Sequence, residues 1–219
     1  MPRRARFVVP GYAHHVTQRG IRGLKTFFRA ADYGLYLELF RERLQESRLK
    51  VCAYCLMPNH IHAVVIPEDE DGLARHFRTL HSNYARYLNA SRGWKGHLWQ
   101  ERFYSAVMDE IHTLCALRYV EMNPVRARLC DRPEQWKWSS VHANLGIRPD
   151  GITDTDTTKK IVSDWRGHLR TPDTAQIRDQ LRKRTRDGQP AGGDDFIDQL
   201  EALTGKDIRP NRSGGKRRK

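Results

Sequence analysis

The chain has 219 residues, a formal net charge of +13 and a pI of about 9.9. This length holds one substantial domain and an appendage, and a hydrophobic content of 38% is enough for a packed core. The positive net charge favours a polyanionic partner, most often nucleic acid, although a soluble basic protein without such a partner can carry an equal charge. The sequence shows no signal peptide and no apolar stretch of about 18 residues, so we expect a cytoplasmic protein that spans no membrane.

Patterns of apolar residues predict a series of strands and helices before residue 146. Pro58-Asn59 is a turn signal between two apolar runs, which therefore form a hairpin. Pro124 ends the regular helix expected before it. The order β-α-β-β-α-β-α-α predicts an α+β sandwich built on an antiparallel sheet. The expected elements, in chain order, are a strand at 7–18, a helix capped by Asp32 and reaching about Ser47, strands at 49–57 and 60–66, a helix at 71–90, a strand at 96–107, a helix at 109–123 and a shorter element at 131–145.

The composition changes after Gly146. Residues 147–219 hold 17 Lys and Arg against 12 Asp and Glu, and apolar residues become sparse. Residues 188–193 are typical of a linker, 194–204 predict one short amphipathic helix, and the chain ends in a basic tail that adds salt-sensitive affinity for DNA. We therefore divide the chain into a domain at 1–146 and a basic C-terminal extension, partly flexible and able to add DNA contacts.

Cys52 and Cys55 form a C-x-x-C pair, and the other two cysteines, Cys115 and Cys130, are isolated in the sequence. A zinc knuckle would need a second pair at similar spacing. Positions three apart on a strand point to opposite faces, so the two thiols are expected to diverge. The pattern favours reduced core thiols over a metal or redox site.

Two histidines, His60 and His62, stand in the apolar strand expected at 60–66. Side chains alternate along a strand, so both project from one face, with their Cα atoms about 7 Å apart. That separation suits two imidazoles converging on one cation, whereas a single strand histidine is usually a hydrogen-bonded core residue. The pair alone leaves both interpretations open, because a catalytic metal needs a third ligand and open positions.

The helix expected at 109–123 offers a second set of candidate groups. Tyr119 and Asn123 are i, i+4 neighbours on one face, where the small Ala116 allows close approach. The Asn123 oxygen suits a hard cation such as Mg²⁺ or Mn²⁺, and a tyrosine hydroxyl can attack a DNA phosphodiester to give a covalent phosphotyrosine. Taken singly, Tyr119 is equally a packing tyrosine and Asn123 a residue at a helix end. The functional interpretation requires this helix to lie against the histidine face.

Several stretches of the sequence together resemble one family, the REP-associated tyrosine transposases, within the single-tyrosine HUH (IS200-like) transposases. The resemblance covers about residues 5–146, and the stretch at 188–201 with the basic tail is more loosely similar to the C-terminal extensions of many members. The stretches that carry it are residues 12–20, MPNHIH at 57–62, HLWQERF at 97–103, RYVEMNPVRA at 118–127 and WSS at 138–140.

The resemblance implies a ferredoxin-like α+β sandwich, with a central antiparallel sheet that carries the HUH motif and helices packed on it. It implies that Tyr119 is the nucleophile, giving a 5′-phosphotyrosine and a free 3′-OH. It also implies that His60 and His62, with Asn123, hold a divalent cation, Mg²⁺ or Mn²⁺. Some related transposases have Gln at the position of Asn123, and the Asn side chain has a shorter reach than that of Gln. The implied substrate is single-stranded DNA with REP-type hairpins, and the implied protein is a monomer.

DNA contacts are predicted from side-chain chemistry. Basic grooves hold single strands, phosphate contacts hold hairpin stems and aromatic rings stack on bases. Each candidate also has an ordinary structural interpretation, as part of a solvated face or as a packing ring. The candidates are Arg19, Arg22, Arg75, Arg78 and Arg102, with Trp94 and Trp99 for stacking.

These features together predict a metal-dependent single-stranded DNA endonuclease and strand transferase of the transposase type. The main alternative is a hairpin-DNA-binding regulator without catalysis, which has no need of Tyr119, His60 and His62 together. A metal hydrolase would tolerate loss of the tyrosine. A replication or conjugation initiator of the wider HUH class often carries a helicase module, which this chain is too short to hold.

Overall fold

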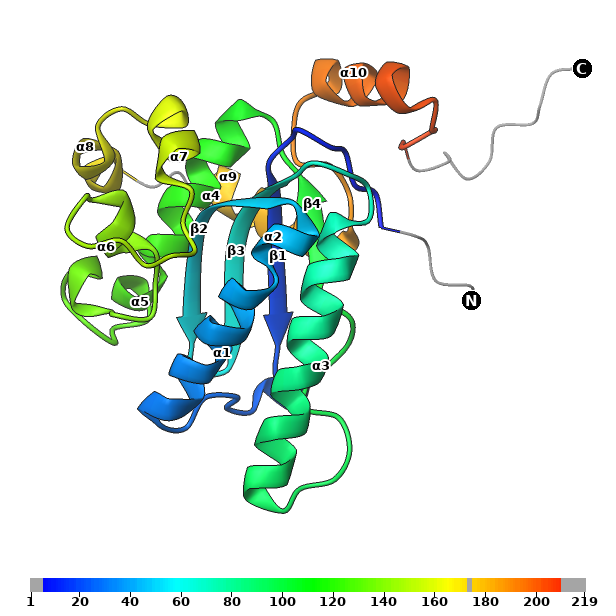
Figure 1. The fold of residues 1–219 in the computed structure, drawn as a ribbon. Helices are drawn as coiled ribbons and strands as arrows, with labels where there is room; N and C mark the ends of the chain where they lie inside the picture. The colour runs from blue at the N-terminus through cyan, green and yellow to red at the C-terminus, as the bar shows by residue number, and fades with distance from the viewer. Residues whose placement is uncertain (1–5, 173–174, 210–219) are drawn as a thin grey trace, which may run out of the picture.

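A four-stranded antiparallel sheet forms the centre of the fold in the computed structural model, which describes residues 6–172 and 175–209. The strands are β1 (His14–Arg19), β2 (Leu49–Met57), β3 (His60–Pro67) and β4 (Tyr104–Val107). Their order across the sheet is β2-β3-β1-β4, so β3 and β1 are the two inner strands (Figure 1).

Helices cover both faces of the sheet. They are the 3-10 turns η1 (Ile21–Gly23) and η2 (Pro133–Gln135) and the α-helices α1 (Ala30–Glu42), α2 (Leu44–Ser47), α3 (Gly72–Arg92), α4 (Glu110–Glu121), α5 (Asn123–Arg126), α6 (Val141–Asn144), α7 (Thr155–Ile161), α8 (Trp165–Arg170), α9 (Ala175–Asp187) and α10 (Asp194–Thr204). α1 and α3 pack on one face through Tyr36, Phe77 and Leu80, and α4 and α9 pack on the other through Leu117 and Leu181 (Figure 1). No helix in the described ranges is long and apolar enough to cross a bilayer.

The predicted hairpin and the predicted α+β sandwich are confirmed. β2 and β3 pair with Met57 opposite His60, on either side of the Pro58-Asn59 turn. A residue pair that closes a tight turn fixes the register of the whole hairpin, and with it the face on which each side chain lies. The shorter element expected at 131–145 is η2 followed by α6.

The first and fourth strands are shorter than predicted. Residues Pro10-Gly11 form a turn, so strand pairing begins only at His14. Residues 96–103 run as a loop before β4, and this loop bonds to the end of β1, where the Gln100 N–H donates to the Arg19 carbonyl at 2.9 Å. Apolar residues in this loop face the core, which gave the stretch the appearance of a strand.

The helix expected from Asp32 to Ser47 is two helices, α1 and α2, which separate at Arg43. Asp32 lies in the first turn of α1 and is not its N-terminal cap as predicted. Its carboxylate accepts the main-chain N–H groups of Phe28 at 2.9 Å and Arg29 at 3.1 Å. These donors precede the helix, so Asp32 fixes the chain that leads into α1.

The helix expected at 109–123 also divides. Asp109 caps α4 by accepting a main-chain N–H of its first turn, and α4 ends at Glu121. α5 then begins at Asn123. Pro124 is tolerated there because the first turn of a helix does not use its main-chain N–H groups internally.

The C-x-x-C cysteines are free and buried, but their thiols do not diverge as predicted. A β-bulge between Val51 and Ala53 inserts one residue into β2 and reverses the alternation of side chains. Cys52 and Cys55 therefore both belong to the core cluster beneath α4. Burial raises the pKa of the Cys52 thiol to about 12, which is typical of an unreactive core thiol.

The C-terminal segment packs on the rest of the fold. α9 lies against α4 and β4. The stretch at 188–193 was expected to be a linker, but Ala191 pairs beside β4, donating to the Val107 carbonyl at 2.8 Å and accepting the Asp109 N–H at 3.0 Å. The basic tail at 214–219 lies outside the described residues.

Glu121, at the end of α4, is a fully buried carboxyl group that joins three segments. Its oxygens accept hydrogen bonds from Ser140 Oγ at 2.6 Å, Asn144 Nδ2 at 2.7 Å and Trp165 Nε1 at 2.7 Å. Burial raises the pKa of Glu121 to about 7, although these donors act in the opposite direction. The group ties α4 to α6 and to α8.

We expect the fold to lose stability as Glu121 loses its proton. A carboxyl group whose pKa rises on folding favours the folded state fully below its unfolded pKa of 4.5, and this contribution is lost as the pH rises through about 7. The contribution of Glu121 to the free energy of unfolding should fall by up to about 3 kcal/mol over this window, while buried histidines with lowered pKa values, such as His15 and His60, add stability over the same window. Urea unfolding of the native and Glu121→Gln chains at both ends of the window measures the Glu121 contribution as the difference between their pH dependences, and the Glu121→Gln chain should gain more stability as the pH rises. An equal pH dependence in both chains would contradict this account.

Candidate functional site

The two strand histidines lie side by side on the sheet face that α4 covers. The ring centroids of His60 and His62 are 4.9 Å apart, and Tyr119 of α4 meets His62 edge-on at a centroid distance of 5.2 Å. Tyr119 and His62 are 2% and 6% exposed. The geometric condition set by the sequence is therefore met, because the tyrosine helix lies against the histidine face.

A third histidine, His15 of β1, extends this cluster. Its ring stacks on His62 at 5.2 Å and meets Tyr119 edge-on at 6.0 Å. Its Nε2 lies 3.0 Å from His62 Nδ1, and its Nδ1 lies 2.8 Å from Thr185 Oγ1 of α9. The sequence alone does not place His15 or Thr185 in the site, because strand alternation does not show that β1 pairs with β3.

Hydrogen bonds around these rings determine which nitrogen of each histidine carries the proton. The Thr185 hydroxyl donates to the Leu181 carbonyl at 2.8 Å, so its oxygen accepts from His15 Nδ1–H. His15 Nε2 is then the acceptor for His62 Nδ1–H, which leaves the lone pair of His62 Nε2 available. This atom is buried and has no hydrogen-bond partner among the described residues.

His60 has the same protonation pattern. Asn59 Nδ2 donates to the Gly23 carbonyl at 2.9 Å, so Asn59 Oδ1 accepts from His60 Nδ1–H at 2.6 Å, and His60 Nε2 is unprotonated. Burial, with nearby arginine charge, lowers the pKa of His60 to about 4 and that of His15 to about 3. Neutral imidazoles with the second nitrogen held by a hydrogen bond are what metal ligation by histidine requires.

Two arginines contact Tyr119. Arg182 Nε of α9 donates to the phenol oxygen at 3.2 Å. Arg126 lies over the ring face, its Cζ 4.4 Å from the centroid, and also donates to the main-chain carbonyl of Tyr119. The Arg182 side chain is 59% exposed, so it marks the solvent side of the phenol. Positive charge at this point stabilises negative charge on the oxygen or on an approaching phosphate.

Asn123, the predicted third ligand, is the first residue of α5, one helical turn beyond Tyr119. Its side chain is buried, and its Nδ2 has no hydrogen-bond partner among the described residues. Within residues 6–172 and 175–209, no three His, Cys, Asp or Glu side chains are arranged to hold a metal ion. Two histidines at such a site therefore need a ligand of another type, and a carboxamide oxygen is one.

The arginines predicted to contact DNA have exposed side chains and lie in three separate places. Arg19 and Arg22 lie at the His60 end of the sheet, and Arg75 lies at the opposite end, where it pairs with Asp69. Arg78 and Arg102 line a groove between α3 and the loop before β4, so this groove has basic groups on both sides.

Trp99 is a packing residue. It is 9% exposed, its indole N–H donates to the His81 carbonyl at 3.0 Å, and its ring lies 6.0 Å from that of Tyr84. Trp99 also lines the groove beside α3 with Arg78 and Arg102, and its stacking on DNA bases stays a prediction. Trp94, the other tryptophan considered for stacking, is 46% exposed.

The fold and these groups define a class of α+β protein in which a strand with two histidines faces a helix that carries a tyrosine. The chain matches the family model for IS200-like transposases over residues 12–123, a segment that contains His60, His62, Tyr119 and Asn123. The chain belongs to the IS200-like transposase family. No curated protein gives a significant match to it.

Solved structures similar to the chain include those of two transposase-type proteins. A REP-associated tyrosine transposase bound to a REP hairpin has a TM-score of 0.56 at 18% identity, covering 69% of this chain and 90% of that one. A putative transposase from Deinococcus radiodurans R1 has a TM-score of 0.36 at 16% identity, covering 62% of this chain and 98% of that one. The first of these confirms the fold expected from the resemblance.

Proposed function

We propose that the protein is a metal-dependent single-stranded DNA endonuclease and strand transferase that acts on REP-type hairpin DNA. The observation that carries the proposal is the contact of the Tyr119 ring with His62, which lies beside His60. Both are neutral histidines whose Nε2 atoms are unprotonated. Membership of a transposase family supports the DNA substrate. The REP hairpin bound by a protein of similar fold and the net charge of +13 support the hairpin.

In the proposed reaction, the phenol oxygen of Tyr119 attacks the phosphorus of a phosphodiester. A bond forms between this oxygen and phosphorus, and the bond from phosphorus to the 3′ oxygen of the preceding nucleotide breaks. The phenol proton passes to solvent, and the leaving oxygen takes up a proton to become a free 3′-OH. The 5′-phosphate stays esterified to Tyr119, and attack by a 3′-OH in the reverse sense transfers the strand and regenerates the phenol.

The residues around Tyr119 fit a bound cation and an incoming phosphate. Mg²⁺ or Mn²⁺ would be held by the Nε2 atoms of His60 and His62 with the Asn123 carboxamide, and would supply Lewis-acid polarisation of the phosphate. Because Tyr119 is 2% exposed, the phosphate reaches it only if the Arg182 side chain moves from the phenol. The Arg182 guanidinium would then donate to a phosphate oxygen in place of the phenol oxygen.

We expect Thr185→Val to weaken the binding of divalent cations by about tenfold, because removal of the hydroxyl takes away the acceptor that fixes the His15 tautomer. His62 then loses its fixed partner as well. Calorimetric titration with Mn²⁺ measures the affinity. Thr204→Val, which loses a similar hydroxyl-to-carbonyl bond on α10, is the matched control and should bind like the native chain. Native affinity in Thr185→Val would show that this hydrogen-bond chain does not act on a metal site.

The proposal is tested with a labelled single-stranded oligonucleotide that contains an imperfect hairpin. The oligonucleotide is incubated with the protein and Mg²⁺ or Mn²⁺, and the products are separated under denaturing conditions. We expect a shortened strand and a protein–DNA adduct, both absent with chelator and with fully paired duplex DNA. Cleavage without any adduct would favour a simple metal hydrolase over the proposed transferase.

One observation favours the second candidate function, a hairpin-binding regulator without catalysis. Tyr119 is buried, and α9 places Arg182 on its hydroxyl. A regulator keeps this arrangement on binding DNA, whereas the proposed enzyme must open it. Hairpin binding without cleavage under either metal would decide for the regulator.

A further inference from the structure

Two exposed aromatic rings lie at the C-terminal end of α3. Phe28 and Trp94 are 38% and 46% exposed, and no other Phe, Tyr or Trp among the described residues is classed as exposed. Their ring centroids are 5.6 Å apart. The guanidinium of Arg92 lies against both rings, with its Cζ 3.6 Å from the Phe28 centroid and 5.4 Å from the Trp94 centroid. We call these three residues the aromatic–arginine surface.

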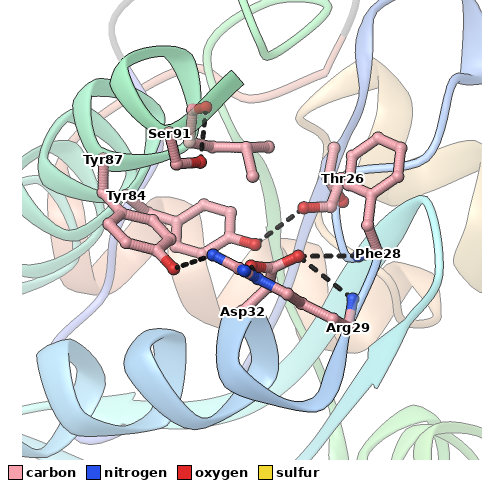
Figure 2. Close-up of polar contacts among 8 residues, drawn as sticks. Thr26, Phe28, Arg29, Asp32, Tyr84, Tyr87 and Ser91 are labelled. Atoms are coloured by element: carbon pink, nitrogen blue, oxygen red, sulfur yellow. Dashed lines mark hydrogen bonds and ion pairs between the residues drawn. The ribbon is translucent and has the colours of Figure 1, made fainter.

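Hydrogen bonds hold the main chain at Phe28 in place, as Figure 2 shows. Asp32 is 1% exposed, and its carboxylate accepts the N–H groups of Phe28 and Arg29. The Tyr84 hydroxyl donates to the Thr26 carbonyl at 2.7 Å and ties the same loop to α3. The loop therefore presents the Phe28 ring to solvent from a fixed backbone.

The backbone at Trp94 is fixed as well. Gly93 ends α3 in the left-handed conformation, with φ of 63°, which a glycine adopts without strain. The Trp94 N–H donates to the Asn89 carbonyl at 2.9 Å, and the Asn89 side chain donates to the Gly96 carbonyl at 2.9 Å. Two rings held on fixed backbones lose little conformational freedom when a ligand stacks on them.

The exposed charge next to the surface is positive, since the nearby Asp32 is buried. The segments 20–31 and 89–98 contain no Asp or Glu, and Arg92 has no carboxylate at ion-pair distance among the residues that the structure describes. The cations of the two segments are Arg22, Lys25, Arg29, Arg92 and Lys95, of which Arg29 is paired with the buried Asp32. An uncharged apolar partner would leave the other four without a counter-charge, whereas a strand of nucleic acid supplies both phosphates and flat bases.

Main-chain hydrogen bonds join the loop that carries Phe28 to the turn before His60, at one end of the sheet, although α3 and the histidine pair lie on opposite faces. The Pro58 carbonyl accepts the N–H groups of Thr26 at 2.9 Å and Phe27 at 3.1 Å. Asn59, which bonds to the Gly23 carbonyl, also holds the ring of His60. A strand whose phosphate lies at His60 can therefore follow the loop at 23–28 onto the surface.

We propose that the aromatic–arginine surface binds unpaired bases of single-stranded DNA next to the cleavage site, by stacking on Trp94 and Phe28 and by contact of Arg92 with a phosphate. The inference rests on the proposed function for its substrate class. Stacking of a base on an aromatic side chain contributes to affinity whatever the base, so the surface holds the strand without selecting its sequence.

The test is the binding of a fluorescein-labelled oligothymidylate, followed by fluorescence anisotropy without added metal. We expect Trp94→Ala to weaken binding by about tenfold with an unchanged salt dependence, because stacking releases no counterions. Trp94→Phe should restore most of the loss. Arg92→Ala should weaken binding and also reduce the salt dependence by about one counterion.

Two control variants separate the surface from general effects. Leu203→Ala trims another exposed apolar side chain, on α10, and Arg43→Ala removes one positive charge between α1 and α2, and both should bind like the native chain. Native affinity in Trp94→Ala would overturn the inference. The outcome is independent of cleavage: absence of a protein–DNA adduct would refute the proposed function, whereas the Trp94 result decides on the surface alone.

Discussion

Replacing Tyr119 with phenylalanine is expected to abolish the protein–DNA adduct and to lower strand cleavage on the order of 10³-fold or more, because the variant lacks the attacking oxygen. The phenyl ring keeps the edge-on contacts with His15 and His62. The phenol oxygen bonds to Arg182, whose side chain is largely exposed, so the fold should tolerate the change. Denaturing electrophoresis of the hairpin reaction measures both effects.

The control for this variant is Tyr104→Phe. Tyr104 belongs to β4 and lies outside the histidine cluster, so its hydroxyl should be dispensable for cleavage. Hairpin binding should be close to native in both variants, because neither change removes a positive charge. An adduct at native yield in the Tyr119→Phe chain would refute the assignment of the nucleophile.

Replacing His62 with alanine is expected to lower cleavage by at least about 100-fold and to remove the response of the protein to divalent cations. The change deletes the buried Nε2 that has no protein partner, and leaves His15 Nε2 without its donor. The second effect costs stability, so activity alone would not separate a lost ligand from a damaged fold. The decisive readout is the shift of the thermal unfolding midpoint on addition of Mn²⁺, which the native chain should show and His62→Ala should lack.

A matched control for His62 stands on the neighbouring strand. His14 is also a buried strand histidine, but its ring nitrogens bond to the Val9 N–H and the Tyr12 carbonyl, so both are already used. His14→Ala should lower the unfolding midpoint and keep the Mn²⁺ shift. Loss of the shift in both variants would mean that the shift reports general destabilisation and would remove the support for a metal at His62.

The sequence predicted the parts of the site that depend on local pattern. The i, i+2 spacing placed His60 and His62 on one face of a strand, and the turn at Pro58-Asn59 set their register. The helix of Tyr119 was found within two residues of its predicted ends. The resemblance to a family then indicated that these two elements meet, which no local pattern shows.

The parts that the sequence did not predict depend on pairing between distant segments. His15 belongs to the cluster only because β1 lies beside β3, and Thr185 and Arg182 only because α9 folds back onto α4. The stretch around Trp99 contains apolar residues that suggest a strand, yet it forms a loop, and the Trp99 ring fills the core beside α3. Periodicity reports which side chains are buried, but it does not report what buries them.

In the proposed reaction, the Tyr119 oxygen becomes joined to the 5′-phosphate of a cleaved DNA strand. The most direct measurement is peptide mass spectrometry of the nuclease-trimmed adduct formed by the native chain with a hairpin oligonucleotide and Mn²⁺. We expect a nucleotide attached through its 5′-phosphate to the peptide that contains Tyr119, and a released strand that ends in a 3′-OH. Attachment at any other residue, or cleavage that leaves every peptide unmodified, would contradict the proposed reaction.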